Sequence, residues 1–342
     1  MSIEPIKSID ENSLNEEEHK MYSQIGTEII KNEQIAVCIL AGGQGTRLGH
    51  NGPKGTFMVP LDNPKSIFQI QVETLLRAYK EYGTHVYFFV MTSKDNDEIT
   101  KQFLNDNNYF GYPKDKIKFF VQGELPLTNR NKVELQNEDG SPIMAPNGNG
   151  GIFKALEDEG IIDLMKEQNI KYLVTENVDN ILANPIDAIA LGILEENNSE
   201  IGIKCVDKAN PEERVGNTVL KDGRPTVIEY TDFPKDLASE LDENGELKYK
   251  EAHFGVNYFS LNLLNRIAEE KLPIHEAYKS NDKYGDFIKY EMFIFDGFEK
   301  ANNGIAIHVN RDDEFAPIKN KEGVDSPYTA KELYVKKYKQ EN

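Results

Sequence analysis

From residue 35 onward, short apolar runs alternate with longer stretches in which apolar positions recur every three or four residues. The apolar runs are rich in β-branched and aromatic residues, which is typical of strands. The stretches with helical spacing predict amphipathic helices. Predicted strands span 35–40, 85–91, 116–122, 171–179, 200–206, 225–231, 253–261 and 304–310, and predicted helices span 66–81, 95–107, 151–168 and 186–196. This alternation favours an α/β fold with a mostly parallel sheet flanked by helices.

The two ends of the chain differ from this central part, which we expect to form one domain over residues 35–320. Residues 1–34 are polar and rich in charge, and they predict a helical segment that packs on the domain. Residues 321–342 predict a helical tail, in which Ser326 caps a helix with Pro327 in its first turn. Between residues 200 and 260 the strands follow one another closely, so we expect the sheet to be mixed there.

The formal net charge of −19 over 342 residues narrows the range of partners. A nucleic-acid-binding protein needs a basic surface to neutralise the phosphate backbone, so we expect no nucleic-acid partner. No run approaches the roughly 20 apolar residues of a membrane helix, and the first residues lack a signal-peptide pattern. We therefore expect a cytoplasmic protein with no membrane partner. Cys38 and Cys205 lie inside apolar runs and predict neither a disulfide nor a metal cluster.

The segment LAGGQGTRLGHNGPKG, residues 40–55, directly follows the first predicted strand and contains six glycines. Glycine-rich turns in this position hold phosphate groups with backbone N–H donors. A Walker loop needs a Gly-Lys dipeptide, which the chain lacks, and Leu48 occupies the third glycine position of the dinucleotide-binding G-x-G-x-x-G motif. The design that remains is a nest of backbone N–H groups, to which Arg47 and Lys54 add positive charge.

This loop resembles the signature of the UDP-sugar pyrophosphorylases, which reads L-x-x-G-x-G-T-R-L-G followed by P-K-G. Six further segments match in the same order: QGELPLTNRNKVELQ, MAPNGNGGIFKALED, VDNIL, KANPEERVGNTVLKDGRPTVIEYTD, IKYEMFIFDGF and RDDEFAPIKN. The resemblance is strongest to the UDP-N-acetylhexosamine pyrophosphorylases and covers about residues 35–327. It implies a Rossmann-like, GT-A-like nucleotidyltransferase fold, with residues 35–320 as the catalytic domain.

Enzymes of this family join UTP and a sugar 1-phosphate, with Mg²⁺, to give a UDP-sugar and pyrophosphate. A sugar-phosphate oxygen attacks the α-phosphorus in line, and this oxygen is already an anion near neutral pH, so no activated Ser, Cys or His is required. Catalysis then rests on positioning and on stabilising charge at the transferring phosphorus. The resemblance implies that Lys54 is the main catalytic cation and that Arg47 acts on the pyrophosphate side.

The resemblance also implies a set of nucleotide-binding residues: Leu40, Ala41, Gly42, Gly43, Lys54, Gln122, Gly148, Asp179 and Lys289. Gln122 offers both a donor and an acceptor, and together with the backbone of Gly148 it would select uracil. Asp179 would hold Mg²⁺ between phosphate oxygens at the end of its predicted strand. Asn177 replaces the cysteine that usually stands two residues before this aspartate.

On the sugar side, the expected substrate-binding residues are Asn149, Glu229, Tyr230, Asn257 and Lys319. Glu229 suits a sugar because a carboxylate accepts hydrogen bonds from two hydroxyl groups. Asn257 lies in a segment that departs from the family, since the chain reads EAHFGVN where NAGNI-x-N is usual. This departure leaves the choice of hexose open. We assign no role to His253, because the expected chemistry needs no base there.

We therefore expect a uridylyltransferase that uses UTP and N-acetylglucosamine 1-phosphate, with these small molecules as its partners. Within the class, the alternatives are a UTP–glucose-1-phosphate uridylyltransferase and a broad-specificity UDP-sugar pyrophosphorylase. The alternative from another class is a non-catalytic UDP-sugar-binding protein, and a dinucleotide-dependent oxidoreductase is a more distant one. The presence together of Arg47, Lys54, Asp179, Lys289 and Lys319 favours an enzyme, because a binding protein has little need of all five.

Overall fold

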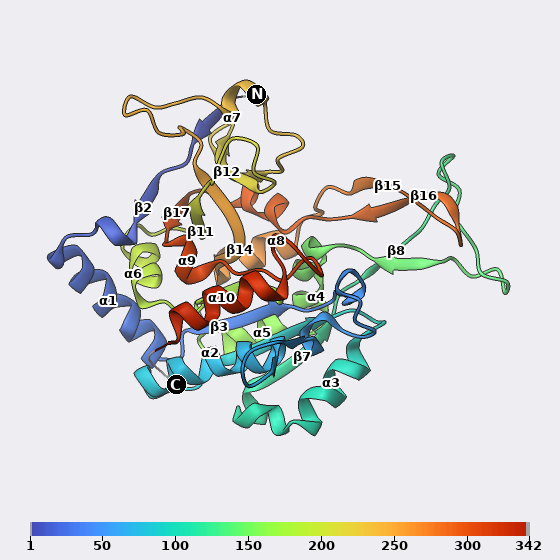
Figure 1. The fold of residues 1–342 in the computed structure, drawn as a ribbon, viewed down its shortest axis with the longest axis horizontal. Helices are drawn as coiled ribbons and strands as arrows, with labels where there is room; N and C mark the ends of the chain where they lie inside the picture. The colour runs from blue at the N-terminus through green and yellow to red at the C-terminus, as the bar shows by residue number, and fades with distance from the viewer. Residues whose placement is uncertain (1, 340–342) are drawn as a thin grey trace.

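A mixed sheet of eleven strands runs through the part of the protein that its computed structural model describes, residues 2–339 (Figure 1). The main strand order is β2-β17-β11-β14-β10-β3-β6-β7. Their bounds are β2 (Ser8–Asp10), β17 (Gly304–His308), β11 (Ile201–Asp207), β14 (Glu251–Ser260), β10 (Tyr172–Asn177), β3 (Ile35–Leu40), β6 (Tyr87–Thr92) and β7 (Ile117–Val121). Only β14 runs antiparallel to its neighbours within this order, which covers the described residues. The expected mixed, mostly parallel α/β fold is confirmed.

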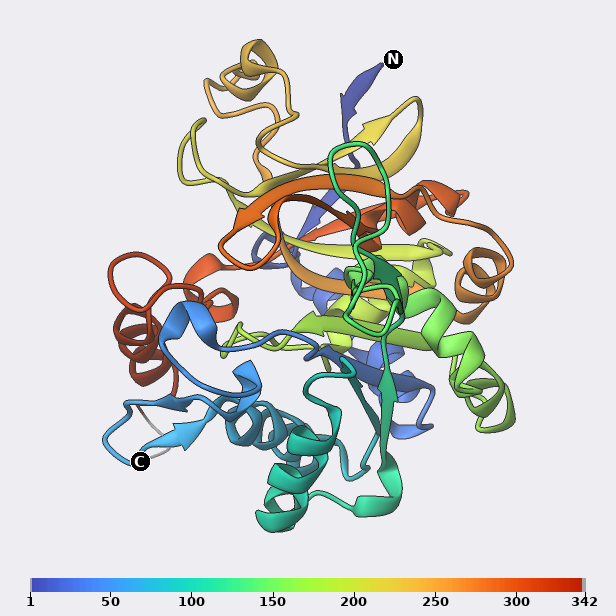
Figure 2. The ribbon, with the colours of Figure 1, turned by 90° about the vertical axis from the view of Figure 1, so that its right-hand side faces the viewer.

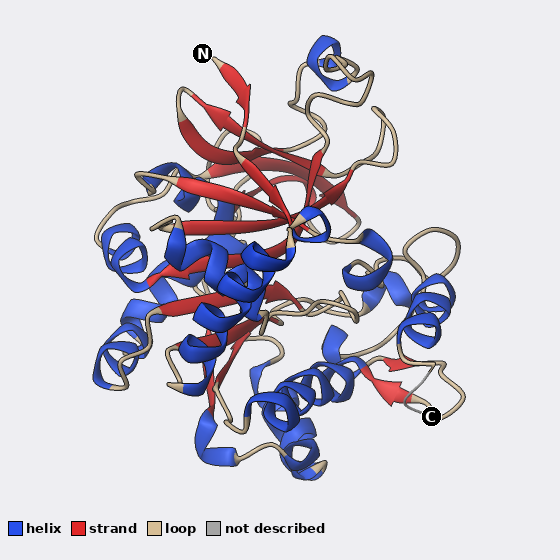
Figure 3. Cartoon of the chain, turned by 90° about the vertical axis from the view of Figure 1, so that its left-hand side faces the viewer, coloured by secondary structure: helices blue, strands red, loops and turns tan. Residues whose placement is uncertain are grey.

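Helices cover both faces of this sheet (Figure 3). The long ones are α1 (Glu16–Lys31), α2 (Ile67–Tyr82), α3 (Asp97–Asp106), α6 (Ala188–Glu196) and α10 (Pro327–Lys337), and all five were predicted. Polar caps fix their first turns: Ser66 accepts from the N–H of Gln69 at α2, and Ser326 from that of Thr329 at α10. The shorter helices are α7 (Lys235–Ala238), α8 (Leu261–Ala268) and α9 (Arg311–Glu314).

The helix predicted over residues 151–168 is divided into α4 (Ile152–Asp158) and α5 (Ile161–Glu167). Gly160 lies between them with a φ of 68°, in the left-handed region that ends a helix. The expectation of one continuous helix was therefore wrong, because the chain turns at this glycine.

The N-terminal segment belongs to the sheet as well as carrying a helix. β1 (Ile3–Pro5) pairs with β12 (Gly216–Lys221), which in turn pairs with β13 (Arg224–Ile228) and β14 (Figure 2). β2 pairs with β17 at the far end of the main order. The expectation of a helical segment over residues 1–34 thus omitted two strands. Met1 of this segment and residues 340–342 of the expected C-terminal tail lie outside the described residues.

A projecting arm lies to one side of the sheet, on the right in Figure 1. It contains the hairpin of β15 (His275–Asn281) and β16 (Gly285–Glu291), and beside it the pair β8 (Glu124–Pro126) and β9 (Met144–Pro146). The backbones of Thr128 and Ile288 exchange two hydrogen bonds of 3.1 and 2.7 Å, which join the two parts. A small hairpin of β4 (Met58–Val59) and β5 (Lys65–Ser66) precedes α2.

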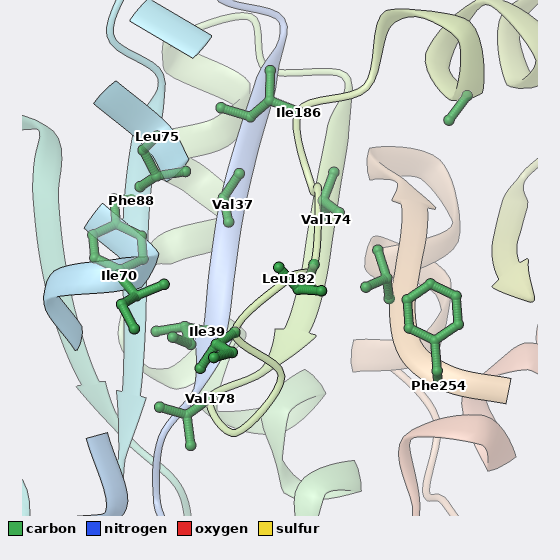
Figure 4. Close-up of a cluster of buried hydrophobic side chains, with 14 of the residues drawn as sticks. Val37, Ile39, Ile70, Leu75, Phe88, Val174, Val178, Leu182, Ile186 and Phe254 are labelled. Carbon is green, nitrogen blue, oxygen red and sulfur yellow. The ribbon is translucent and has the colours of Figure 1, made fainter. Parts of the chain in front are cut away.

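The apolar core lies between the sheet and its helices (Figure 4). Val37 and Ile39 of β3 are fully buried and lie near Ile70 and Leu75 of α2. Every residue of β3 is buried, because the strand has layers of structure on both faces. Among residues 2–339, none of the helices combines the length and the apolar character that a membrane crossing requires.

Candidate active site

The proposed site residues gather where β3, β7 and β10 end. These parallel strands end at one edge of the sheet, with Leu40 paired to Asn177 on one side and to Met91 on the other. Ligands of such sheets bind beyond the carboxyl ends of the strands. The glycine loop after β3, Gln122 after β7 and Asp179 after β10 therefore come together although they are far apart in sequence.

The glycine loop is held in shape by bonds to its own backbone and to its neighbours. The Lys54 N–H donates to the carbonyl of Gly43 over 3.0 Å. The buried amide of Asn96 donates to the carbonyl of Ala41 over 2.9 Å. Gly55 lies so close to Phe68 that an added Cβ would be 2.3 Å from its ring. The loop thus needs no ligand to adopt this conformation.

A cavity of about 440 Å³ opens beside this loop. Its wall includes six of the expected nucleotide-binding residues: Leu40, Gly42, Gly43, Gln122, Gly148 and Lys289. Gly42 lies against Gln122, since an added Cβ would be 2.7 Å from the side-chain Nε2. Gly148 has a φ of 85°, and a Cβ there would be 2.5 Å from the carbonyl oxygen of Met292. Glycine is required at Gly148 by the close approach to backbone and by its positive φ, whereas the atom nearest to Gly42 is the end of a side chain that can move.

Lys54 and Asp179 form an ion pair at the same edge, with 2.6 Å between Nζ and Oδ2. Both side chains are partly buried. Among the described residues no group of three or more His, Cys, Asp or Glu side chains is arranged to hold a metal ion by itself. Mg²⁺ is commonly held by one or two carboxylates together with substrate phosphates, so the single carboxylate of Asp179 fits such an ion.

A second cavity, of about 180 Å³, adjoins the first, because Asn149 and Asn177 line both. Its wall also includes Asp179, Glu229 and Lys319. Asn149 accepts the N–H of Ile294 with Oδ1 at 3.0 Å, which leaves its amide N–H groups available as donors. Burial raises the pKa of Glu229, and Asp232 adds to this effect while Lys319 opposes it.

Two further lysines of the site have carboxylate partners within the protein. Lys289 Nζ is 2.7 Å from Glu291 Oε1 on β16, and Lys319 Nζ is 3.7 Å from Asp325 Oδ2. Lys319 is placed by the segment after α9, where the N–H of Ile318 donates to the carbonyl of Asp179 over 2.9 Å. Positive groups thus converge on the two cavities inside a chain of strongly negative net charge.

Five expected site residues lie outside the walls of these cavities, and one of them is Lys54. Arg47 is exposed on the loop, and Tyr230 is 43% exposed. Ala41 is buried and donates its N–H to the carbonyl of Met91 over 2.8 Å. Asn257 is 1% exposed and bonds the ring of His253. The structure therefore places Arg47 and Tyr230 at the surface and Asn257 behind His253.

The second cavity also contains residues that the sequence analysis did not assign, namely Arg214 and His253. Arg214 is exposed and has no ion-pair partner among the described residues. Its segment, KANPEERVG, was matched to the family, but nothing in the sequence indicated that this arginine would line the smaller cavity. Asn96 holds the glycine loop through its bond to Ala41, and apart from its place after a strand nothing in the sequence predicted this role.

Comparisons with known proteins agree with this geometry. The family model for UTP–glucose-1-phosphate uridylyltransferase matches residues 1–336. The Dictyostelium discoideum protein named "Probable UDP-N-acetylglucosamine pyrophosphorylase" is 35% identical, covering 92% of this chain and 71% of that protein. The UDP-N-acetylglucosamine pyrophosphorylase of Saccharomyces cerevisiae is 32% identical, with 98% and 76% covered.

A solved structure supports the same assignment. The uridine diphosphate N-acetylglucosamine pyrophosphorylase from Trypanosoma brucei, in complex with an inhibitor, is similar to this chain with a TM-score of 0.89 and 31% identity. The match covers 98% of this chain and 73% of that one. The chain belongs to the UTP–glucose-1-phosphate uridylyltransferase family and is a uridylyltransferase, as its motifs predicted.

Proposed function

We propose that the protein transfers the uridylyl group of UTP to N-acetylglucosamine 1-phosphate, with the nucleotide in the larger cavity and the sugar in the smaller one. The observation that carries this proposal is the shared wall of Asn149 and Asn177, beside which Asp179 and Lys54 are paired. A ligand that spans both cavities would bring its phosphates to this pair. The names of the relatives, together with the motifs, favour N-acetylglucosamine over glucose.

The chain's own groups account for the steps of such a transfer. A phosphate oxygen of the sugar 1-phosphate attacks the α-phosphorus of UTP, the bond to the bridging oxygen breaks, and pyrophosphate leaves with that oxygen. Lys54 would stabilise the negative charge that develops around the transferring phosphorus, since its ammonium group already lies at the same edge of the sheet. Lys289 and Lys319 would hold phosphate oxygens on the nucleotide and sugar sides.

Asp179 would hold Mg²⁺, which would neutralise part of the triphosphate charge when bound. The carboxylate pairs with Lys54, whose ammonium group therefore lies at the same edge of the sheet and would hold phosphate oxygens beside the site of the ion. Gln122, held over Gly42, would read the uracil edge together with the backbone of Gly148.

The test is pyrophosphate release from UTP and Mg²⁺ in the presence of four sugar 1-phosphates: N-acetylglucosamine, N-acetylgalactosamine, glucose and galactose. We expect release with N-acetylglucosamine 1-phosphate at the highest kcat/KM. A higher kcat/KM with glucose 1-phosphate would replace the sugar assignment but keep the reaction. No release with any sugar, from a folded protein that still binds UTP, would favour a non-catalytic UDP-sugar-binding protein.

A further inference from the structure

His253 occupies the wall of the smaller cavity together with Glu229, Asp179 and Lys319. It lies on β14, in the segment EAHFGVN, where the family motif NAGNI-x-N has a glycine at the corresponding position. The imidazole therefore adds both volume and a polar group to the place where the proposed function puts the sugar. What the ring can do there depends on which of its nitrogens carries the proton.

The hydrogen bonds of the ring settle that question. Nε2 of His253 is 2.8 Å from Oδ1 of Asn257, and the amide of Asn257 donates to Oγ1 of Thr175 over 3.3 Å. Since Oδ1 of Asn257 can only accept, Nε2 must donate its proton to it. In a neutral imidazole the other nitrogen, Nδ1, is then an acceptor. Among the described residues Nδ1 has no hydrogen-bond partner.

The ring is also held in place and kept neutral. The rings of His253 and Phe298 are nearly perpendicular, with 6.1 Å between their centroids. Burial lowers the pKa of His253 to about 4, and Lys319 adds to this while the bond with Asn257 opposes it. The charged groups that share the cavity are Asp179, Glu229, Arg214 and Lys319. At neutral pH the imidazole that lines the cavity beside them is thus fixed and uncharged.

We propose that His253 is a specificity-determining residue whose Nδ1 accepts a hydrogen bond from a hydroxyl or amide N–H group of the hexose. This inference rests on the proposed function, because it places the sugar in the smaller cavity. Hydroxyl and amide N–H groups share the chemistry that a neutral imidazole nitrogen recognises. A sugar that lacks this donor would leave a buried acceptor without a partner, which an enzyme discriminates against strongly.

The experiment compares the wild type with two variants, using N-acetylglucosamine 1-phosphate, glucose 1-phosphate and their deoxy analogues at single ring positions. His253→Phe keeps the ring volume and removes the acceptor. His253→Asn is the matched control, because an asparagine can place Oδ1 near the position of Nδ1. Values of kcat/KM for each sugar, KM for UTP and melting temperatures are measured for all three proteins.

We expect one deoxy position to lower kcat/KM about 10-fold in the wild type and in His253→Asn, the loss expected from one hydrogen bond. The same deoxygenation should cost nothing in His253→Phe, and KM for UTP should be unchanged. His253→Gln, which can keep the bond to Asn257 without an acceptor at Nδ1, replaces the phenylalanine variant if that variant fails to fold.

Equal losses for every deoxy sugar in the wild type and in His253→Phe or His253→Gln would overturn the inference while leaving the transfer reaction intact. A wild type that releases no pyrophosphate with any sugar would overturn the proposed function, and this inference with it. The two failures are therefore distinguishable in the same set of assays.

Discussion

At the scale of single residues, the ion pair of Lys54 and Asp179 shows how positive charge is balanced at the site. The two residues are 125 positions apart in sequence, yet their charged atoms lie 2.6 Å apart. Lys289 and Lys319 also face carboxylates, from Glu291 and Asp325. Ligand phosphates would have to compete with these carboxylates for the lysines. The free protein thus keeps these three lysines in place while neutralising their charge.

Replacing Lys54 with alanine should lower kcat about 10²- to 10³-fold, because one preorganised donor to developing charge typically contributes that much. Binding of the UDP-sugar should weaken far less. Steady-state rates and equilibrium titration of UDP-N-acetylglucosamine measure the two effects. Lys118→Ala, an exposed lysine on β7, is the matched control and should leave both unchanged. Equal losses of binding and turnover in Lys54→Ala would contradict the catalytic assignment.

Replacing Asp179 with asparagine should raise the Mg²⁺ concentration needed for half-maximal rate, because an amide oxygen attracts the cation less than a carboxylate does. Initial rates as a function of MgCl₂ at saturating UTP give this concentration. Asp62→Asn, whose carboxylate is exposed and pairs with Lys331, serves as the control. An unchanged Mg²⁺ dependence in Asp179→Asn would show that the metal is held elsewhere.

The residues that the sequence could place are those at the ends of strands and in the glycine loop. Gln122 and Asp179 could be located because a parallel sheet brings the ends of its strands to one edge, and Gly148 was located by the family motif alone. Asn257 could not, because its position depends on register: it pairs with Thr175, inside the sheet, while His253 lies four residues closer to the edge. Arg47 matched the motif, but its side chain is exposed because of the local turn of the glycine loop.

At the scale of elements, the glycine loop combines positions of two kinds. Some of its glycines are required by the protein, as Gly55 is by Phe68. At Gly43, in contrast, an added Cβ would meet no described atom within 4 Å, and the residue lines the larger cavity. We propose that the open space at Gly43 is occupied by the nucleotide, and an added methyl group would enter that space.

Substituting Gly43 by alanine should leave the free energy of unfolding within about 0.5 kcal/mol of the wild type, since nothing in the protein is displaced. KM for UTP should rise, because the methyl group would enter the cavity. Gly148→Ala provides the contrast: its positive φ and the 2.5 Å approach to Met292 should destabilise the fold. Urea unfolding and UTP kinetics measure both variants, and a destabilised Gly43→Ala would show that this glycine serves the fold.

The strands and helices that the sequence predicted are those with long, regular patterns. All eight predicted strands are present in the described residues, because runs of buried β-branched and aromatic residues specify them. The strands β1, β2, β15 and β16 could not be predicted, since they are short or polar and exist through pairing with partners. A local pattern does not reveal a remote partner.

At the scale of the whole molecule, a buried network of charge joins distant parts of the chain beneath the site. Lys204 on β11 is fully buried and lies 2.6 Å from both Asp187, before α6, and Glu314, at the end of α9. Burial raises the pKa of Glu11 in the N-terminal segment, and Asp187 adds to this. Glu176 on β10 is buried nearby, and its Oε2 has no hydrogen-bond partner among the described residues.

The titration of Glu176 should make the protein less stable as pH rises. Burial raises the pKa of Glu176 well above 4.5, and Glu314 adds to this while Lys204 opposes it. Above pH 4.5 the unfolded chain therefore loses a proton that the folded chain retains. The contribution of this group to the free energy of unfolding falls by about 1.4 kcal/mol per pH unit until the folded pKa is reached.

Glu176→Gln should remove this part of the pH dependence, so that the variant gains stability relative to the wild type between pH 4.5 and pH 7. Urea unfolding at several pH values measures the difference. The exposed Glu159→Gln is the control and should follow the wild type at each pH. A constant difference between Glu176→Gln and the wild type over this range would show that Glu176 is ionised in the fold.

The pairing of β2 with β17 has a consequence for how the protein is made. Residues 8–10 pair with residues 306–308, so β2 leaves the ribosome long before its partner β17 does. β1 meets its partner earlier, since β12 begins at Gly216. This edge of the sheet can close only after β17 has been synthesised, and until then a growing chain carries β2 unpaired.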